Sequence, residues 1–364
     1  MAGVRGAARA GVVGVRGVAG GAASLPALDF RDWREGGPAG RARFAGALRE
    51  ACERTGFFYL RGHGLETVLD EGTAALQDFF ALPPEAKREV SYMASTVYPP
   101  TSRGWQENEW LDPLRRGRGD TKQSFQMGHE DPQAQPPESN PFMGPNLWPD
   151  DAVPLLRPRL STVFSSLHSL ALDMCRAFAS SVGAKDEEVF ARACSGGAMN
   201  MARGLYYPKA TDDPDEIGCS AHSDYGVLTL LHQTGHGLQV LRADASQWLD
   251  VAPAEGHLVC NIADLMERWT NGRYVSSVHR VSVPPGAPAR YSYGFFLDAK
   301  FDTVVAPLEE CCGDRPPRYG PVVAGEHKLS KTRIQYGEDV QDAAHLFTRT
   351  LKSATASSPA RAAL

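Results

Sequence analysis

The sequence lacks several features that would assign it at once to a class of protein. Its seven cysteines are an odd number without CxxC spacing, which argues against a disulfide framework and a zinc knuckle. No run approaches the roughly 18 consecutive apolar residues of a membrane-spanning helix, and no internal repeat is apparent. With a net charge of -5, 22% charged and 42% apolar residues, the composition is ordinary for a globular protein. We therefore expect reduced thiols in an intracellular protein, with no membrane and no nucleic acid as partner.

Acidic residues are absent before Asp29, and residues 1–24 are rich in Ala, Gly and Val with three arginines. This composition is typical of a transit peptide, which would direct the protein to a plastid or mitochondrion. The alternative is a flexible Gly-rich extension on a cytoplasmic protein. Either way, the folded part is expected to begin near Leu25.

The rest of the chain alternates short apolar runs with turn signals. Strands are predicted at 25–30, 56–60 and 122–128, and then repeatedly between 199 and 297; helices are predicted at 40–54, 66–80, 151–184 and 328–351; and residues 93–150 are expected to be loop-rich. The pattern predicts a mainly β fold with flanking helices (α+β) around a double-stranded β-helix, or jelly-roll, core. The expected parts are an extension at 1–24, an N-terminal region at 25–150, a helix plus jelly-roll domain at 151–352, and a disordered tail at 353–364.

Three residues indicate a metal centre. His222 and Asp224 are two apart, so in an extended strand they project to one side, at the start of the apolar run 227–231. His279 lies in a second predicted strand, 274–283. Two imidazoles and one carboxylate occupy one face of an octahedron and leave three positions open, an arrangement that suits non-haem Fe(II). We predict that these three residues bind iron.

Arg290 and Ser292 are also two residues apart. They follow the Pro- and Gly-rich segment 283–288, which is expected to form a turn after the strand of His279. Both side chains are expected on one face of a strand that folds back against the strand of His279. A guanidinium donates two parallel hydrogen bonds and keeps its charge when buried. The pair therefore predicts an anchor for a carboxylate beside the metal.

Together these motifs resemble the 2-oxoglutarate/Fe(II)-dependent dioxygenases of the isopenicillin N synthase-like superfamily. The resemblance covers nearly all of 25–351 and is carried by LPALDF at 25–30, GFFYLRGHG at 56–64, FFALP at 79–83, YYP at 206–208, HSD at 222–224, NGRYVSSVHR at 271–280 and RYS at 290–292.

The resemblance implies that His222, Asp224 and His279 bind Fe(II), that Arg290 and Ser292 bind the distal carboxylate of 2-oxoglutarate, and that Tyr207 contacts this cosubstrate. It also implies reaction with O2 and oxidation, chiefly hydroxylation, of a small organic molecule with release of succinate and CO2. No catalytic residue beyond the metal site is predicted. The family's Asn before YYP is replaced here by Leu205, so Leu205 is left out of the site.

Substrate contacts are predicted from position alone: Lys122, Phe125, Tyr206 and Phe295 could line the pocket, although aromatic residues in strands often belong to the core. Two other functions stay open, namely an isopenicillin N synthase-like oxidase that does not use 2-oxoglutarate and a non-catalytic metal-binding sensor on the same fold. The substrate and the oligomeric state are not predicted.

Overall fold

The computed structural model describes residues 25–94, 103–107, 120–130, 140–213, 216–242, 247–282, 284–314 and 316–335. Eight strands form one sheet in the order β1-β2-β10-β7-β12-β5-β4-β3. They are β1 (Ala27–Asp29), β2 (Phe57–Arg61), β3 (Gly104–Glu107), β4 (Gln123–Gly128), β5 (Met201–Tyr207), β7 (Leu228–Gln233), β10 (His257–Ile262) and β12 (Arg290–Leu297). All neighbouring pairs except β1 with β2 are antiparallel.

A second, antiparallel sheet has the order β6-β11-β8-β9, and a two-stranded sheet pairs β13 with β14. These strands are β6 (Cys219–His222), β8 (Leu238–Leu241), β9 (Trp248–Asp250), β11 (His279–Val281), β13 (Val304–Val305) and β14 (Val322–Val323). The mixed α+β architecture with multistranded antiparallel sheets confirms the predicted jelly-roll fold class. Whether the chain divides into domains at 150 and 352 stays a prediction, and strands from both sides of residue 150 share the large sheet.

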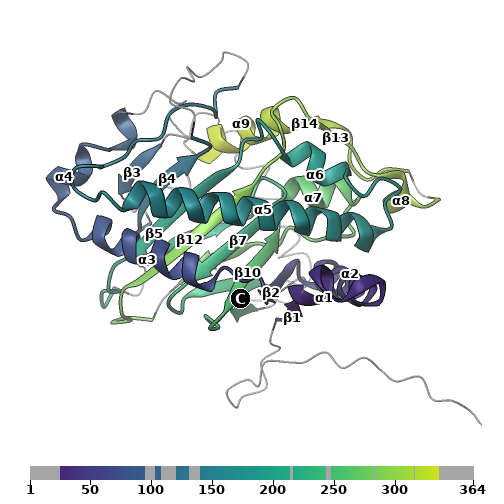
Figure 1. Cartoon of the computed structure of the whole chain (residues 1–364), viewed down its shortest axis with the longest axis horizontal. Coiled ribbons are helices and arrows are strands. Elements are labelled where there is room, and N and C mark those ends of the chain that lie inside the picture. Colours follow the sequence, from purple (N-terminus) through teal and green to yellow (C-terminus); the bar gives the residue numbers. More distant parts are fainter. Residues whose placement is uncertain are drawn as a thin grey trace, which may run out of the picture.

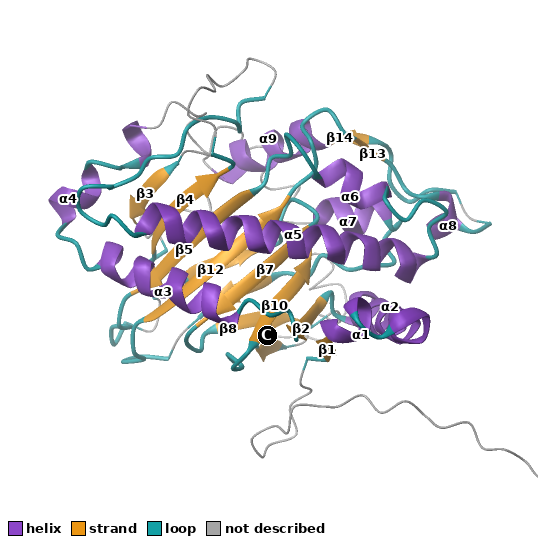
Figure 2. Ribbon diagram, viewed as in Figure 1, coloured by secondary structure: helices purple, strands orange, loops and turns teal. Residues whose placement is uncertain are grey.

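Helices cover one face of the large sheet. Figure 1 shows α3 and α5 crossing in front of β5, β12 and β7, and Figure 2 shows the same layer with helices in purple. The helices are α1 (Phe30–Arg34), α2 (Gly37–Arg54), α3 (Glu66–Phe80), α4 (Pro84–Arg88), α5 (Leu156–Val182), α6 (Val189–Cys194), α7 (Asp264–Trp269), α8 (Glu309–Cys312) and α9 (Ala324–Gln335), with a 3-10 turn at Tyr92–Ala94.

The longest helix, α5, shows how the sequence builds this layer. Leu160, Phe164 and Leu167 recur at helical spacing and are buried. The helix stops at Gly183, whose φ of 73° places it in the left-handed region that glycine adopts at helix ends. The apolar stripe of α5 packs on the large sheet together with α2 and α3, and this layer holds the main hydrophobic core.

The predicted strand at 274–283 was largely wrong, because only His279–Val281 forms β11. In the residues just before β11, backbone N–H groups donate to side chains at the C-terminal end of α7 instead of to a neighbouring strand. Tyr274 N–H donates to Thr270 Oγ1 at 3.1 Å, and Ser276 N–H donates to Glu267 Oε2 at 2.8 Å. Bonds of this kind compete with a strand ladder. In the segment expected to be loop-rich, β3 pairs with the correctly predicted β4.

The C-terminal helix begins at Ala324, four residues before its predicted start, and its expected continuation over 336–351 lies outside the described residues. The extension at 1–24 and the tail at 353–364 also lie outside them. In the part of the chain that the structure describes, no helix combines the length and apolar character needed to cross a membrane.

Candidate metal centre and cosubstrate pocket

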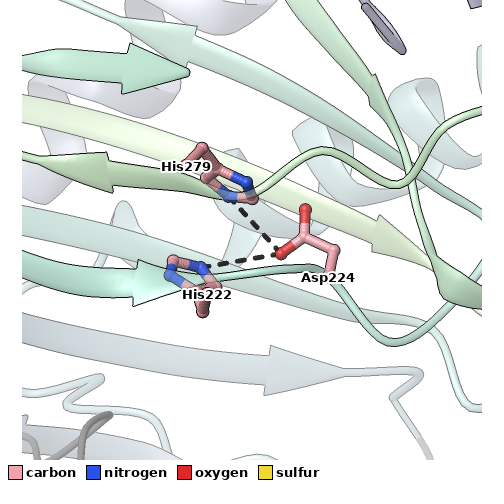
Figure 3. Close-up of side chains that lie close together, drawn as sticks. All are labelled: His222, Asp224 and His279. Carbon is pink, nitrogen blue, oxygen red and sulfur yellow. Dashed lines mark ion pairs between the residues drawn. The ribbon is translucent and has the colours of Figure 1, made fainter. Parts of the chain in front are cut away.

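The four-stranded sheet β6-β11-β8-β9, called the small sheet below, brings the two predicted histidine ligands together. His222 is the last residue of β6 and His279 the first of β11, and the two are directly paired across these antiparallel strands. Asp224 does not belong to β6, contrary to the expected strand geometry, but lies in the turn that follows. The backbone N–H of Asp264 donates to the carbonyl of Asp224 at 2.9 Å, which ties this turn to the start of α7. Figure 3 shows the three side chains converging.

The hydrogen bonds of the two imidazoles leave their Nε2 atoms ready to bind a metal. His222 Nδ1 lies 2.8 Å from the Ser220 carbonyl, and His279 Nδ1 lies 3.1 Å from the Ser277 carbonyl. Because a carbonyl only accepts, each Nδ1 carries the proton and each Nε2 keeps its lone pair. Both Nε2 atoms lie 3.7 Å from the same oxygen, Asp224 Oδ1.

The other carboxylate oxygen of Asp224 is held from behind. Asp224 Oδ2 accepts hydrogen bonds from Thr229 Oγ1 at 2.5 Å and from Asn261 Nδ2 at 2.7 Å. These bonds fix the carboxylate so that Oδ1 faces the histidines. Partners of this kind orient metal ligands and tune their affinity. One ligand atom from each of the three residues lies within 4.8 Å of the others, so the donor set fits one divalent cation.

Electrostatics favour the protonation states that ligation needs. Burial raises the pKa of Asp224, but the His279 and His222 imidazoles and the two hydrogen bonds outweigh it, and the net pKa is lowered. Burial, followed by the neighbouring His222, lowers the pKa of His279 to about 4. Near pH 7 the carboxylate is therefore ionised and His279 neutral, and both forms bind metals.

The metal ligands open into a cavity of about 140 Å³ between the large and small sheets. One water needs only about 10–15 Å³ of such space, so the cavity has room for a small organic molecule. Arg290, Ser292 and Tyr207 line it, as do all three metal ligands. The predicted metal and carboxylate anchors thus face one space.

Arg290 is a buried cation without a carboxylate partner among the described residues. Only 2% of the residue is exposed, its Nη1 donates to the His236 carbonyl and its Nη2 to Gln233 Oε1, both at 3.2 Å. Its guanidinium lies 4.8 Å from the ring centre of Tyr207, and Nε has no hydrogen-bond partner. Burial lowers the pKa of Arg290, but a guanidinium stays charged near neutral pH. A buried charge calls for an opposite charge, and here an anionic ligand would supply it.

The structure corrects three of the four predicted substrate contacts. Phe125 packs against Phe79 of α3, and Phe295 packs against Phe164 of α5. Tyr206 stacks on Phe80, again on the helix side. Only Lys122 lines the cavity, where its ammonium lies 2.7 Å from Asp120 Oδ2 in a buried ion pair.

Strand parity could have prevented these errors. Side chains two apart share a face, so Arg290 and Ser292 assign Phe296, not Phe295, to the cavity, and Tyr207 excludes Tyr206. The same rule groups Lys122 with Gln126. Thr229 and Asn261, which sequence reasoning missed, left only the weak signal of polar residues within apolar strands.

Two protein families match the chain. Residues 25–151 match the family of the non-haem dioxygenase in morphine synthesis N-terminal region, and residues 198–299 match the 2OG-Fe(II) oxygenase superfamily.

Curated relatives match most of the chain. A homoarginine-6-hydroxylase of Oryza sativa subsp. japonica is 32% identical over 308 residues, covering 79% of this chain and 88% of the relative. The 2-oxoglutarate-Fe(II) type oxidoreductase hxnY of Emericella nidulans is 33% identical over 335 residues, covering 87% and 94%. Among solved structures, a full-length Neurospora crassa protein in complex with alpha-KG superimposes with a TM-score of 0.74 at 26% identity, over 85% of this chain and 95% of that one.

Proposed function

The chain belongs to the 2OG-Fe(II) oxygenase superfamily and is a 2-oxoglutarate-dependent Fe(II) oxidoreductase, and from this premise we propose that it hydroxylates a small organic molecule while releasing succinate and CO2. Its cofactors are Fe(II) and 2-oxoglutarate. In the proposed assignment, His222, Asp224 and His279 hold the iron, whereas Arg290, Ser292 and Tyr207 hold the cosubstrate.

The observation that carries the assignment is the buried Arg290 on the wall of the cavity that contains the metal ligands. The lack of a carboxylate partner for this buried guanidinium among the described residues fits the distal carboxylate of 2-oxoglutarate. Ser292, 3% exposed on the same strand face, adds a hydroxyl that can donate to the same group.

When bound, the iron supplies the redox chemistry that couples decarboxylation of 2-oxoglutarate by O2 to oxidation of the substrate. The chain's own residues position the metal ligands and shield the reacting groups from water. Thr229 and Asn261 hold the Asp224 carboxylate, and the Ser220 and Ser277 carbonyls hold the imidazoles, so the ligands are arranged in advance. The walls of the two sheets limit the access of water to the reacting groups.

Hydroxylation is the reaction named for the relatives from rice and from Arabidopsis thaliana and Glycine max, all homoarginine-6-hydroxylases. Other similar proteins concern different molecules: the Neurospora crassa protein was also solved with thymine, and JOX2 with 2OG, Fe and JA. This diversity supports a small-molecule substrate without naming it.

Anaerobic titration of the Fe(II) protein with 2-oxoglutarate tests the assignment through the visible metal-to-ligand charge-transfer band. We expect a band in the wild type, a band that needs far more 2-oxoglutarate in Arg290→Ala, and none in His279→Ala. Arg280→Ala is the matched control, because Arg280 neighbours His279 but packs on Trp248 and is not part of the cavity wall. A wild-type protein that binds iron but shows no band would refute the cosubstrate role of the cavity.

A further inference from the structure

A segment from the N-terminal half of the chain lies along the residues that lead to His222. Residues 120–122 directly precede β4 of the large sheet, and residues 216–220 lead into β6, the edge strand of the small sheet. Thr121 N–H donates to the Ile217 carbonyl at 3.1 Å, and Thr121 Oγ1 donates to Glu216 Oε1 at 3.2 Å. The segment therefore connects the large sheet to one edge of the small sheet.

The ladder of β6 gives His222 little support of its own. Among the described strands, β6 pairs with β11 alone. His222 is paired with His279, and Cys219 is paired with Val281, so between these pairs β6 contains one residue more than β11. An extra residue of this kind disrupts the ladder locally and leaves a backbone group unpaired. The orientation of His222 then depends on contacts from outside the sheet.

Asp120 supplies such a contact. Its Oδ1 accepts hydrogen bonds from the Ser220 N–H at 3.0 Å and from Ser220 Oγ at 2.7 Å. The carbonyl of the same Ser220 accepts from His222 Nδ1 at 2.8 Å. Asp120 and Ser220 are 2% and 4% exposed, so these bonds form in a low-dielectric environment where they are strong. One carboxylate oxygen thus holds the residue that orients the imidazole.

The other oxygen of Asp120 is held by a cation of the cavity wall. Lys122 Nζ lies 2.7 Å from Asp120 Oδ2 and 3.6 Å from the sulfur of Cys219, the residue before Ser220. With both oxygens engaged, the carboxylate keeps one orientation and its charge is balanced. Removing one member of such a buried pair is strongly destabilising, so a test of Asp120 must change Lys122 as well.

We propose that Asp120 is a positioning residue for the metal centre: through Ser220 it holds His222 in the orientation that binds Fe(II), and Lys122 in turn holds Asp120. This role rests on the proposed function, in which His222 is an iron ligand. The N-terminal half of the chain thereby completes a metal site whose three ligands all lie in the C-terminal half.

The test compares two double variants of equal charge. In Asp120→Asn/Lys122→Met the amide oxygen can still accept from Ser220, whereas Asp120→Ala/Lys122→Met has no side-chain acceptor at position 120. Both variants lose the whole ion pair. Anaerobic competition with a chelator of known affinity measures Fe(II) binding. We expect Fe(II) to bind about 10–100-fold more weakly to Asp120→Ala/Lys122→Met than to Asp120→Asn/Lys122→Met.

Thr121→Val is the matched control. It removes a side-chain hydrogen bond between the same two segments but keeps the bonds from Ser220 to Asp120. Urea unfolding without metal gives the stability of each variant. A positioning role predicts that Thr121→Val keeps the wild-type Fe(II) affinity even where its stability falls. Equal Fe(II) affinity in the two double variants, or an equally large loss in Thr121→Val, would overturn the proposal.

A second measurement needs no mutation and decides the outcome if Asp120→Ala/Lys122→Met fails to fold. If the bond between Asp120 and Ser220 favours metal binding, a bound metal must favour that bond by the same factor. Hydrogen exchange of the Ser220 N–H in the wild type should therefore slow about tenfold or more when Zn(II), a diamagnetic substitute for Fe(II), is added. The Thr121 N–H should slow less, and equal slowing at the two amides would contradict the role of Asp120.

The Fe(II) affinity of the wild type separates this proposal from the proposed function. Tight binding to the wild type together with equal affinities in the two double variants refutes only the role of Asp120. A wild-type protein that binds no Fe(II) refutes the proposed function and the role of Asp120 with it.

Discussion

The two faces of the large sheet carry opposite kinds of side chain on the same strands. On β12, Tyr293 and Phe295 face the helices and are buried in the main hydrophobic core. Arg290, Ser292 and Phe296 face the cavity and the small sheet. The strand thus builds the core with one set of alternate residues and the site with the other.

The difference shows how the fold accommodates costly groups. The cavity face holds a buried arginine without a carboxylate partner among the described residues and a glutamine oxygen without a hydrogen bond. Such groups destabilise a folded chain, and the close-packed helix face offsets that cost. Changes on the helix face should therefore alter stability first, and changes on the cavity face should alter binding first.

The largest expected effect is a loss of stability after a change on the helix face, which is the face of the large sheet that the helices cover. Phe295→Ala deletes a fully buried ring that packs on Phe164, and we expect the free energy of unfolding to fall by about 3–5 kcal/mol. Phe296→Ala, the adjacent residue on the partly exposed cavity face, should cost clearly less. Urea unfolding of both variants measures the difference. Equal losses would break the comparison between the faces.

Arg290→Gln should separate binding from stability on the cavity face. Removing the cation that holds an anionic ligand should weaken 2-oxoglutarate binding by about 2–4 kcal/mol, measured by anaerobic titration. The free energy of unfolding without ligand should change by less than about 1 kcal/mol, since the folded protein also loses a buried charge. A variant that unfolds readily but keeps its 2-oxoglutarate affinity would show that Arg290 is structural.

Asn261→Ala should weaken Fe(II) binding about 10–100-fold, because Asp224 Oδ2 loses one of its two hydrogen bonds. Competition with a chelator of known affinity measures the change. Cys260→Ala is the matched control on β10, since Cys260 lies in the helix-side core and should affect stability without affecting iron. Unchanged iron affinity in Asn261→Ala would remove Asn261 from the site.

The smallest expected effect is the pH dependence of stability that His129, on the helix side of the large sheet, contributes. Burial, then His168 and Arg103, lower the pKa of His129 to about 4 from 6.5, and its Nε2 accepts from Asn200 Nδ2 at 3.2 Å. Below pH 6.5 the unfolded chain takes up a proton that the folded chain does not, so stability falls as pH drops from 6.5 toward 4. His129 should contribute a loss of about 1–2 kcal/mol between pH 6.5 and 5.

Unfolding of the wild type and of His129→Gln at both pH values isolates this contribution from that of the other histidines. The variant should lose less stability than the wild type on acidification. An identical pH dependence in the two proteins would mean that His129 is protonated equally easily in both states.

Much of the site followed from spacing and residue chemistry. His222, Asp224 and His279 were predicted as one cluster, and the structure brings their ligand atoms within 4.8 Å. The prediction placed Asp224 in a strand, whereas the turn that presents it is held by α7, forty residues away in the chain. Sequence periodicity carries no information about such a bond, because it joins distant segments.

The sequence by itself determined which residue types could do the chemistry and that they recur at a period of two. Only the tertiary structure decided which phase of that period faces the cavity, as Phe125, Tyr206 and Phe295 show by packing on the helix side. It also decided which polar residues meet, such as Gln126 with Arg203 and Asn261 with Asp224. The reason is physical: alternation is a local property of a strand, whereas the burial of each face depends on the layers that pack against it.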